Sequence, residues 1–191
     1  MLILILGLIV FFAAHSFVTF RAARAGAIEQ LGLTAYRALF GLVSLVGLAL
    51  IVWGFAQYRA YDLIQVWSPS AFMRHITVGL MVPAVILFVA AFIPSHIKAK
   101  AKHPMLAGIK TWALAHLLSN GDLGSILLFG LFLTWGVYAR IAAKRRTDFV
   151  VAPVPAGWTN DIIVVVLGIV IYLALGYAFH PMVIGVPVFG R

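Results

Sequence analysis

The chain contains no cysteine among its 191 residues. Thiolate metal ligands, iron–sulfur clusters held by cysteine, disulfides and thiol nucleophiles are therefore excluded within this chain. Acidic residues are almost as scarce, because Asp and Glu together number five, and each lies in a predicted loop or at the end of an apolar run. Without a carboxylate in the middle of a span, paired-carboxylate catalysis and proton-coupled transport through a buried acid are disfavoured.

Charged residues of either sign are also rare, at 10% of the chain, whereas hydrophobic residues make up 64%. This composition and the mean hydropathy of +1.09 are typical of an integral membrane protein, since an ordinary soluble domain is about 25% charged. Each of six apolar runs is close in length to the roughly 17–25 residues with which a helix crosses a bilayer. We predict an all-α, polytopic membrane helix bundle of one domain, residues 1–191, surrounded by the lipid bilayer, with six transmembrane helices at about 1–20, 39–56, 75–94, 104–119, 123–140 and 162–179.

Basic residues are unevenly distributed over the predicted connections. With the N-terminus outside, only Arg59, Arg74 and Arg191 lie on the outer side. The other eleven of the fourteen lie inside: Arg21, Arg24, Arg37, Lys98, Lys100, Lys102, Lys110, Arg140, Lys144, Arg145 and Arg146. The positive-inside rule therefore predicts a multi-pass protein of the inner (cytoplasmic) membrane with both termini outside. Anionic lipid head groups explain the net charge of +9, and no nucleic-acid partner is expected.

Three of the apolar runs carry small, aromatic and histidine residues at four-residue spacing, which places them on one helix face. Such a face has gaps beside flat rings and an imidazole at its edge, and it suits a buried flat metal cofactor. Glycine at this spacing more often serves close helix packing in membranes, and this alternative stays open. The three faces are Gly7/Phe11/His15, Gly108/Trp112/His116 and Gly168/Tyr172/Gly176/His180.

His15 and His116 lie inside predicted spans, where an ionisable side chain needs a hydrogen-bond partner in a medium without water. This location favours a functional role for both. At about 1.5 Å of rise per residue, His116 is the central one of the histidines. It could pair with His15 toward the inner side or with His180 toward the outer side, and the residues alone do not decide between them.

Other features have simpler interpretations. The His180-Pro181 pair is expected to end the last helix, because proline cannot continue a helix. His75, His96 and His103 are expected to be solvated at the membrane interface. The sequence Asn120-Gly121-Asp122 predicts a tight turn in which Asp122 can cap the helix that follows.

Longer motifs run nearly from end to end of the chain. The central one consists of His103-Pro104-Met105-Leu106-Ala107-Gly108, Trp112-Ala113-Leu114-Ala115-His116 and Asn120-Gly121-Asp122. It is accompanied by Ala14-His15-Ser16 with Arg21, by Tyr36-Arg37, and by His180-Pro181 with Ile184-Gly185-Val186. Together these motifs resemble the NnrU family of small bacterial membrane proteins, which is associated with nitric oxide and nitrite metabolism in denitrifying bacteria. That family is more distantly similar to 15-cis-zeta-carotene isomerase, a haem b membrane enzyme whose two histidine ligands fall in the segments matching His15 and His116.

The resemblance implies a haem b iron held between His15 and His116, with His180 as a reserve metal ligand. Gly7 and Gly108 would then make room for the macrocycle, and Phe11 and Trp112 would pack against it. The other expected cofactor-binding residues are Lys110, Arg21 and Arg37 for the propionates, and Asn120 at the cofactor edge. Such a site could pass an electron, sense nitric oxide or isomerise a lipid-soluble polyene, so that whether the chain is an enzyme is left open.

Two other classes of function compete with haem binding. In the first, the chain is an assembly or regulatory subunit that has respiratory or denitrification enzymes as partners and no cofactor of its own. In the second, it is a small-solute transporter in which glycines and prolines such as Pro83 break helices around a path. The lack of buried carboxylates and of internal repeats argues against transport.

Overall fold

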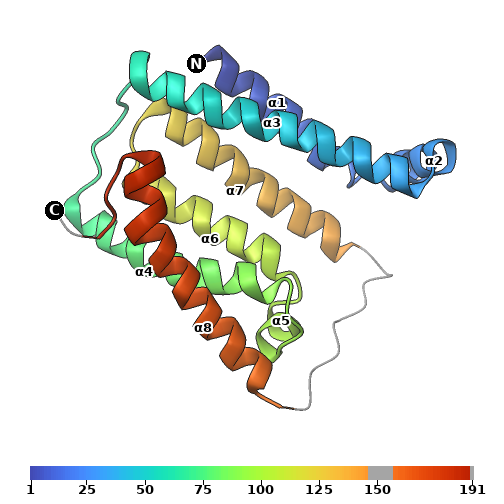
Figure 1. Ribbon diagram of the computed structural model, residues 1–191. Helices are drawn as coiled ribbons and strands as arrows, with labels where there is room; N and C mark the ends of the chain where they lie inside the picture. Colours follow the sequence, from blue (N-terminus) through green and yellow to red (C-terminus); the bar gives the residue numbers. More distant parts are fainter. Residues whose placement is uncertain (146–156, 190–191) are drawn as a thin grey trace. The chain divides into compact units, whose positions relative to one another are not determined.

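The computed structural model describes residues 1–145 and 157–189, in which the regular secondary structure is helical (Figure 1). The described residues divide into two compact units. Unit 1 comprises Met1–Trp67 and Gly121–Leu131, and unit 2 comprises Ser68–Asn120 and the described part of Phe132–Arg191. Arg146 and Arg191, which the charge distribution placed inside and outside, lie outside the described residues.

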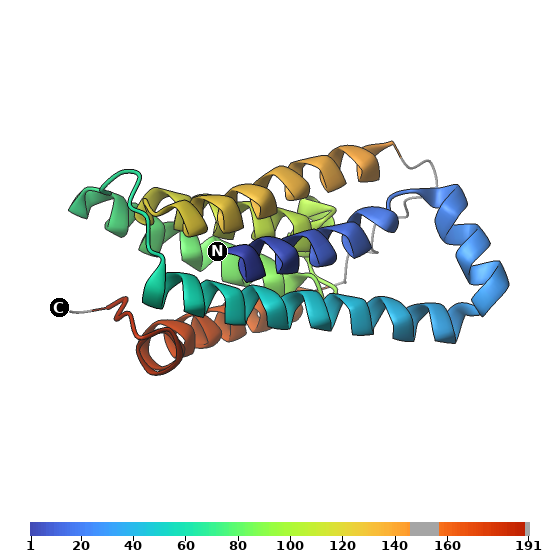
Figure 2. The ribbon, with the colours of Figure 1, turned by 90° about the horizontal axis from the view of Figure 1, so that it is seen from above.

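Unit 1 is built on two helices that lie side by side, α1 (Leu2–Phe17) and α3 (Leu33–Tyr61) (Figure 1, Figure 2). Their backbones approach closely because glycines face the partner helix. A Cβ added at Gly7 would lie 2.6 Å from the backbone nitrogen of Ile51, and one at Gly47 would lie 2.8 Å from that of Phe11. Small residues at a membrane helix interface allow this approach.

The helix α2 (Arg21–Leu31) joins α1 to α3 in a stretch that was expected to be a connection. Its axis is bent by 89° from that of α1. Gly32 ends α2 with φ at +77°, a left-handed conformation that glycine adopts without steric penalty. The turn therefore reverses the chain so that α3 can return along α1.

The chain after α3 pairs with the start of α7 (Leu123–Lys144), whose first turns belong to unit 1. The backbone nitrogen of Val66 donates to the carbonyl of Gly121 at 2.9 Å, and that of Leu123 donates to the carbonyl of Ile64 at 2.9 Å. The Asp122 carboxylate accepts a hydrogen bond from the backbone nitrogen of Ser125 at 2.8 Å. The predicted helix cap at Asp122 is therefore confirmed, whereas the segment before it is extended, with Asp122 bridged to Gln65, rather than a tight turn.

Unit 2 is built around α4 (Ala71–Ala90), which has α6 (Pro104–Ser119) and α8 (Thr159–Ala174) as neighbours (Figure 2). It also contains the short α5 (His96–Ala101) and the later turns of α7. A Cβ added at Gly108 of α6 would lie 2.8 Å from the Phe88 ring of α4, and one at Gly168 of α8 would lie 2.8 Å from the Ile86 side chain of α4. Glycines thus bring both helices close to α4.

The last helix does not end at His180-Pro181, so this prediction is wrong. The α8 helix continues without a break into η1 (Leu175–Ile184), a π-helix with Pro181 inside it. Proline in an α-helix lacks the N–H for its hydrogen bond and its ring meets the carbonyl four residues back. A π turn bonds residues five apart and is wider, so the ring is accommodated. Gly185, at φ +74°, then ends the helix.

Four helices are long and apolar enough to cross a membrane, namely α3, α4, α7 and the continuous α8–η1 helix. The bent pair of α1 and α2 makes a fifth if it is counted as one broken span. The 16 residues of α6 extend about 24 Å, short of the roughly 30 Å hydrocarbon core. The described residues confirm an all-helical membrane protein with four or five candidate spans, whereas six spans with both termini outside stay a prediction.

Candidate functional site

Each of the three histidine-bearing faces packs against another helix. On α1, Gly7 lies against Ile51 and Phe11 lies against Gly47, four residues earlier on α3. On α6, Gly108 lies against Phe88 of α4. The spaces at Gly7 and Gly108, which were expected to admit a macrocycle, are therefore occupied by neighbouring helices. These two glycines have the packing role that the sequence had left as an alternative.

His15 lies at the aromatic end of this α1 face, in unit 1. Its ring stacks on that of Phe11, with centroids 3.9 Å apart, and lies 5.3 Å from the Phe40 ring of α3. The Nδ1–H of His15 donates to the Phe11 carbonyl at 2.8 Å. Phe11 and His15, which four-residue spacing placed on one helix face, are therefore in contact. A pairing of His15 with His116 would join the two units and stays a prediction.

Two buried hydroxyls of unit 1 lie on the α3 face that carries Phe40. Tyr36 and Ser44 precede and follow Phe40 by four residues, so the three share one face. The hydroxyl oxygens of both are buried, and neither has a hydrogen-bond partner among the described residues. A buried hydroxyl without a partner destabilises a fold by about 1–3 kcal/mol, so this face would gain from a polar ligand.

His116 of α6 and His180 of η1 are brought together in unit 2. Their ring centroids lie 6.3 Å apart, and the ring planes differ by 24°. The Trp112 ring is 5.3 Å from His116, and the Phe179 ring is 6.0 Å from His180. Both histidines are half-buried. The structure thus joins the reserve ligand His180 to the central histidine of the sequence pattern.

The two histidines of this pair use the same ring nitrogen for the backbone. The Nδ1–H of His116 donates to the Trp112 carbonyl at 2.9 Å, and that of His180 donates to the Leu175 carbonyl at 2.9 Å. The second acceptor is five residues back because η1 is a π-helix. A histidine held in this way coordinates a metal through Nε2, and the backbone bond raises its basicity as a ligand.

The expected cation and amide partners of a cofactor lie on different elements. Arg21 and Arg37 are exposed on α2 and α3 of unit 1, whereas Lys110 is half-buried on α6 of unit 2. The Lys110 stem lies over Gly136 of α7, with Cγ 2.9 Å from a Cβ added there. The Asn120 amide donates to the His116 carbonyl at 2.8 Å. Asn120 therefore closes the end of the helix that carries His116.

A second histidine contact was missed by the sequence analysis, which placed His96 in solvent. The Nδ1 of His96 lies 2.8 Å from Oδ2 of Asp161, and its ring stacks on Trp158 with centroids 4.2 Å apart. The buried Asp161 carboxylate also accepts hydrogen bonds from the backbone nitrogens of His96 and Ile97 at 3.2 and 3.0 Å. The expectation that His96 is merely solvated is therefore wrong. It packs α5 onto the start of α8.

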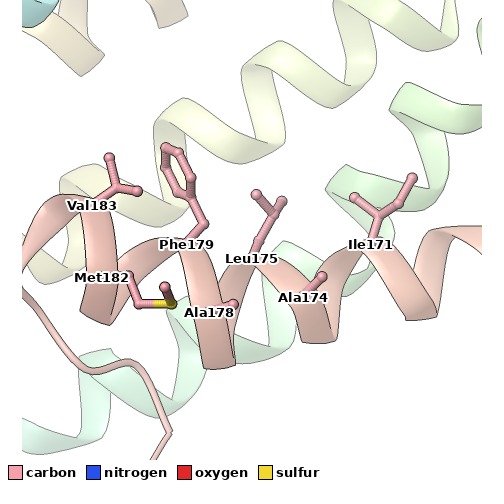
Figure 3. A pocket seen from close by; sticks show the side chains of 7 residues that line it. All are labelled: Ile171, Ala174, Leu175, Ala178, Phe179, Met182 and Val183. Atoms are coloured by element: carbon pink, nitrogen blue, oxygen red, sulfur yellow. The ribbon is translucent and has the colours of Figure 1, made fainter.

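The helix that carries His180 also has an apolar hollow of about 370 Å³ on its surface. Figure 3 shows its lining side chains along one stripe of α8 and η1, from Ile171 to Val183. Phe179, which precedes His180, is one of them. The lining is apolar, as expected for a surface that faces acyl chains or another apolar molecule.

Among residues 1–145 and 157–189, no group of three or more His, Asp or Glu side chains is placed so that it could hold a metal ion. This excludes a structural zinc-type site there, which has four protein ligands. A haem iron takes its four equatorial ligands from the macrocycle and needs only axial ligands from the protein. The donor chemistry of His116 and His180 fits such a group.

The sequence matches one known protein family over nearly its whole length. A family model described as NnrU protein matches residues 3–188. No curated protein and no solved structure matches the chain. The matched region contains all of the histidines and nearly the entire sequence. This protein therefore belongs to the NnrU family.

Proposed function

We propose that this NnrU family protein binds haem b within the membrane, with His116 as an axial ligand of the iron. The observation that supports this most directly is the position of His116. Its Nδ1–H is bonded to the Trp112 carbonyl, its ring lies beside the Trp112 ring, and a second imidazole is 6.3 Å away. Neutral imidazoles fixed by the backbone are axial ligands of haem b proteins.

The residues of the chain hold and tune the group. Axial histidines are one of the means by which a protein sets the potential of a haem iron, and the surrounding apolar helices limit access of water to it. Bound haem supplies a one-electron couple and an iron centre that can take up nitric oxide. We propose a redox or sensing role in nitric oxide and nitrite metabolism at the bacterial cytoplasmic membrane, in line with the physiology of the family.

Three candidate cations would compensate the haem propionates, namely Arg21, Arg37 and Lys110. Charge-assisted hydrogen bonds are about twice as strong as neutral ones, so even one such pair would orient the macrocycle. Lys110 is on the same helix as His116, and its stem is held over Gly136. Of the three candidates, Lys110 is therefore the one that lies in the same unit as His116.

An absorption spectrum tests this function. The full chain is expressed with added haem precursor and purified in detergent, and we expect a Soret band with six-coordinate, low-spin character. His116→Ala should abolish or strongly shift the band. His75→Ala is the matched control, because His75 is exposed on α4 of the same unit, and it should leave the spectrum unchanged. A colourless wild-type protein would refute the proposal.

A further inference from the structure

We propose that His180 is the second protein ligand of the metal that His116 binds. The proposal rests on the proposed function where the metal is haem iron, and it assigns the site to unit 2 alone. Its basis is the juxtaposition of His116 on α6 and His180 on η1. The two come from helices far apart in sequence, and their ring centroids lie 6.3 Å apart.

The separation of the two rings is one that a shared metal ion allows. Imidazole nitrogens lie about 2.0–2.1 Å from a bound metal ion such as zinc, so the ring centroids of two imidazoles that share a metal can be up to about 6 Å apart. The observed centroid distance is 6.3 Å. The centroid distance is therefore compatible with a shared metal ion.

The orientation of the two rings also suits a shared ligand. Each Nδ1–H donates to a backbone carbonyl of its own helix, Trp112 for His116 and Leu175 for His180. With Nδ1 used as a donor, either ring would coordinate a metal through Nε2, and the ring planes differ by only 24°. In an α-helix the acceptor would be four residues back. The π turn at Leu175–Ile184 supplies the acceptor for His180 from five residues back.

Hydrogen bonds to α4 position the two helices that carry His116 and His180. The Thr77 hydroxyl donates to the carbonyl of Ala115, which precedes His116, at 2.7 Å. The Tyr172 hydroxyl of α8 donates to the carbonyl of Val78 at 3.2 Å. Thr77 and Val78 are neighbours on α4, so this one turn positions the two helices that carry the imidazoles. A site on rigid helices keeps its geometry better than one on loops.

Substitution of the two competing partners of His116 tests the pairing. In the haem-loaded full chain, His180→Ala should convert the low-spin spectrum to a high-spin, five-coordinate one, and added imidazole should restore the low-spin form. His15→Ala should leave the low-spin spectrum intact. If instead His15→Ala gives the high-spin form and His180→Ala does not, the pairing is wrong while haem binding stands.

A second variant separates ligation from folding. His180→Met replaces the imidazole with an apolar side chain of similar length. Methionine ligation opposite histidine raises the reduction potential of haem. We expect a low-spin haem with a raised potential in His180→Met and an unchanged potential in His15→Met. Equal potentials in His180→Met and the wild type would overturn the assignment.

If the wild-type protein contains no haem, the proposed function fails and the pair is tested with copper instead. Cu²⁺ is titrated into the purified chain and followed by electron paramagnetic resonance. One Cu²⁺ per chain should bind, with the affinity lowered at least about tenfold in His116→Ala and in His180→Ala alike, and unchanged in His15→Ala. An affinity that is the same in His180→Ala and the wild type would refute the pair.

Discussion

Helix faces with the same pattern of glycine, aromatic residue and histidine have different surroundings in the two units of this protein. In unit 1, the face with Gly7, Phe11 and His15 packs onto α3, and His15 is placed between two phenylalanine rings. In unit 2, the faces with Gly108 and Gly168 both pack onto α4, and the ring centroids of His116 and His180 lie 6.3 Å apart. A glycine–aromatic–histidine face is thus a packing device in both units. Unit 2 differs in that a second histidine, His180, lies near the first, and the proposed metal site rests on this pair.

Side-chain hydroxyls also differ between the two units. Those of Thr77 and Tyr172 in unit 2 donate to carbonyls of neighbouring helices. Those of Tyr36 and Ser44 in unit 1 have no hydrogen-bond partner among the described residues. Buried polar groups are nearly always paired in native structures. The α3 face near His15 therefore has a polar requirement that the described residues do not meet.

Glycine-to-alanine changes give the largest expected difference between the units. A Cβ at Gly47 meets the backbone of Phe11 at 2.8 Å, which cannot move alone, whereas one at Gly108 meets the Phe88 ring, which can rotate, and lies 3.1 Å from the backbone oxygen of Ala84. We expect Gly47→Ala to lower the free energy of unfolding by about 2–3 kcal/mol and Gly108→Ala by about 1 kcal/mol. Denaturant unfolding in mixed detergent micelles measures both.

Gly41 on α3 is the control for these changes, because nothing lies within 4 Å of a Cβ added there. Gly41→Ala should stabilise the protein by up to about 1 kcal/mol, since alanine is the better helix former. If Gly47→Ala were as stable as Gly41→Ala, the close approach of α1 and α3 would be wrong.

The two buried helix-capping carboxylates give the next effect. Asp161 in unit 2 accepts hydrogen bonds from the backbone nitrogens of His96 and Ile97 as well as contacting the His96 ring, whereas Asp122 in unit 1 accepts one from Ser125. We expect Asp161→Ala to destabilise the packing of α5 on α8 by about 2 kcal/mol and Asp122→Ala to cost about 1 kcal/mol. Amide hydrogen exchange at α5 should accelerate only in Asp161→Ala. Unchanged exchange there would contradict the docking role.

Paired tyrosine-to-phenylalanine changes sharpen the comparison within unit 1. The Tyr58 hydroxyl donates to the Ile64 carbonyl and accepts from the Ile64 nitrogen, so Tyr58→Phe should lower the free energy of unfolding by about 1–2 kcal/mol. Tyr36→Phe removes a hydroxyl without a partner and should be neutral or stabilising. A loss of stability in Tyr36→Phe equal to that in Tyr58→Phe would show that a bound group satisfies the Tyr36 hydroxyl.

Much of the fold could be predicted from hydrophobicity alone. Each of the six apolar runs is a helix in the structure, and the Asp122 cap is where turn chemistry placed it. The 16-residue length of α6 agrees with the predicted span at 104–119. The sequence could not give the 89° bend after α1, because tertiary packing overrides the local preferences of an apolar segment.

The candidate site was predictable in its residue types and not in its pairing. Rise per residue left open whether His116 pairs with His15 or with His180, and the count assumed α-helical geometry to the end of the last helix. The π-helix at Leu175–Ile184 changes both the advance and the rotation of the chain before His180. The His96 contact with Asp161 spans 65 residues and has no local pattern that could reveal it.

The electron paramagnetic resonance spectrum of the ferric, haem-loaded protein tests the central claim most directly. Imidazole planes that differ by 24° should give a rhombic low-spin signal in the wild type, and His180→Ala should replace it with a high-spin signal. The same low-spin signal in His180→Ala and the wild type would contradict a metal held between His116 and His180.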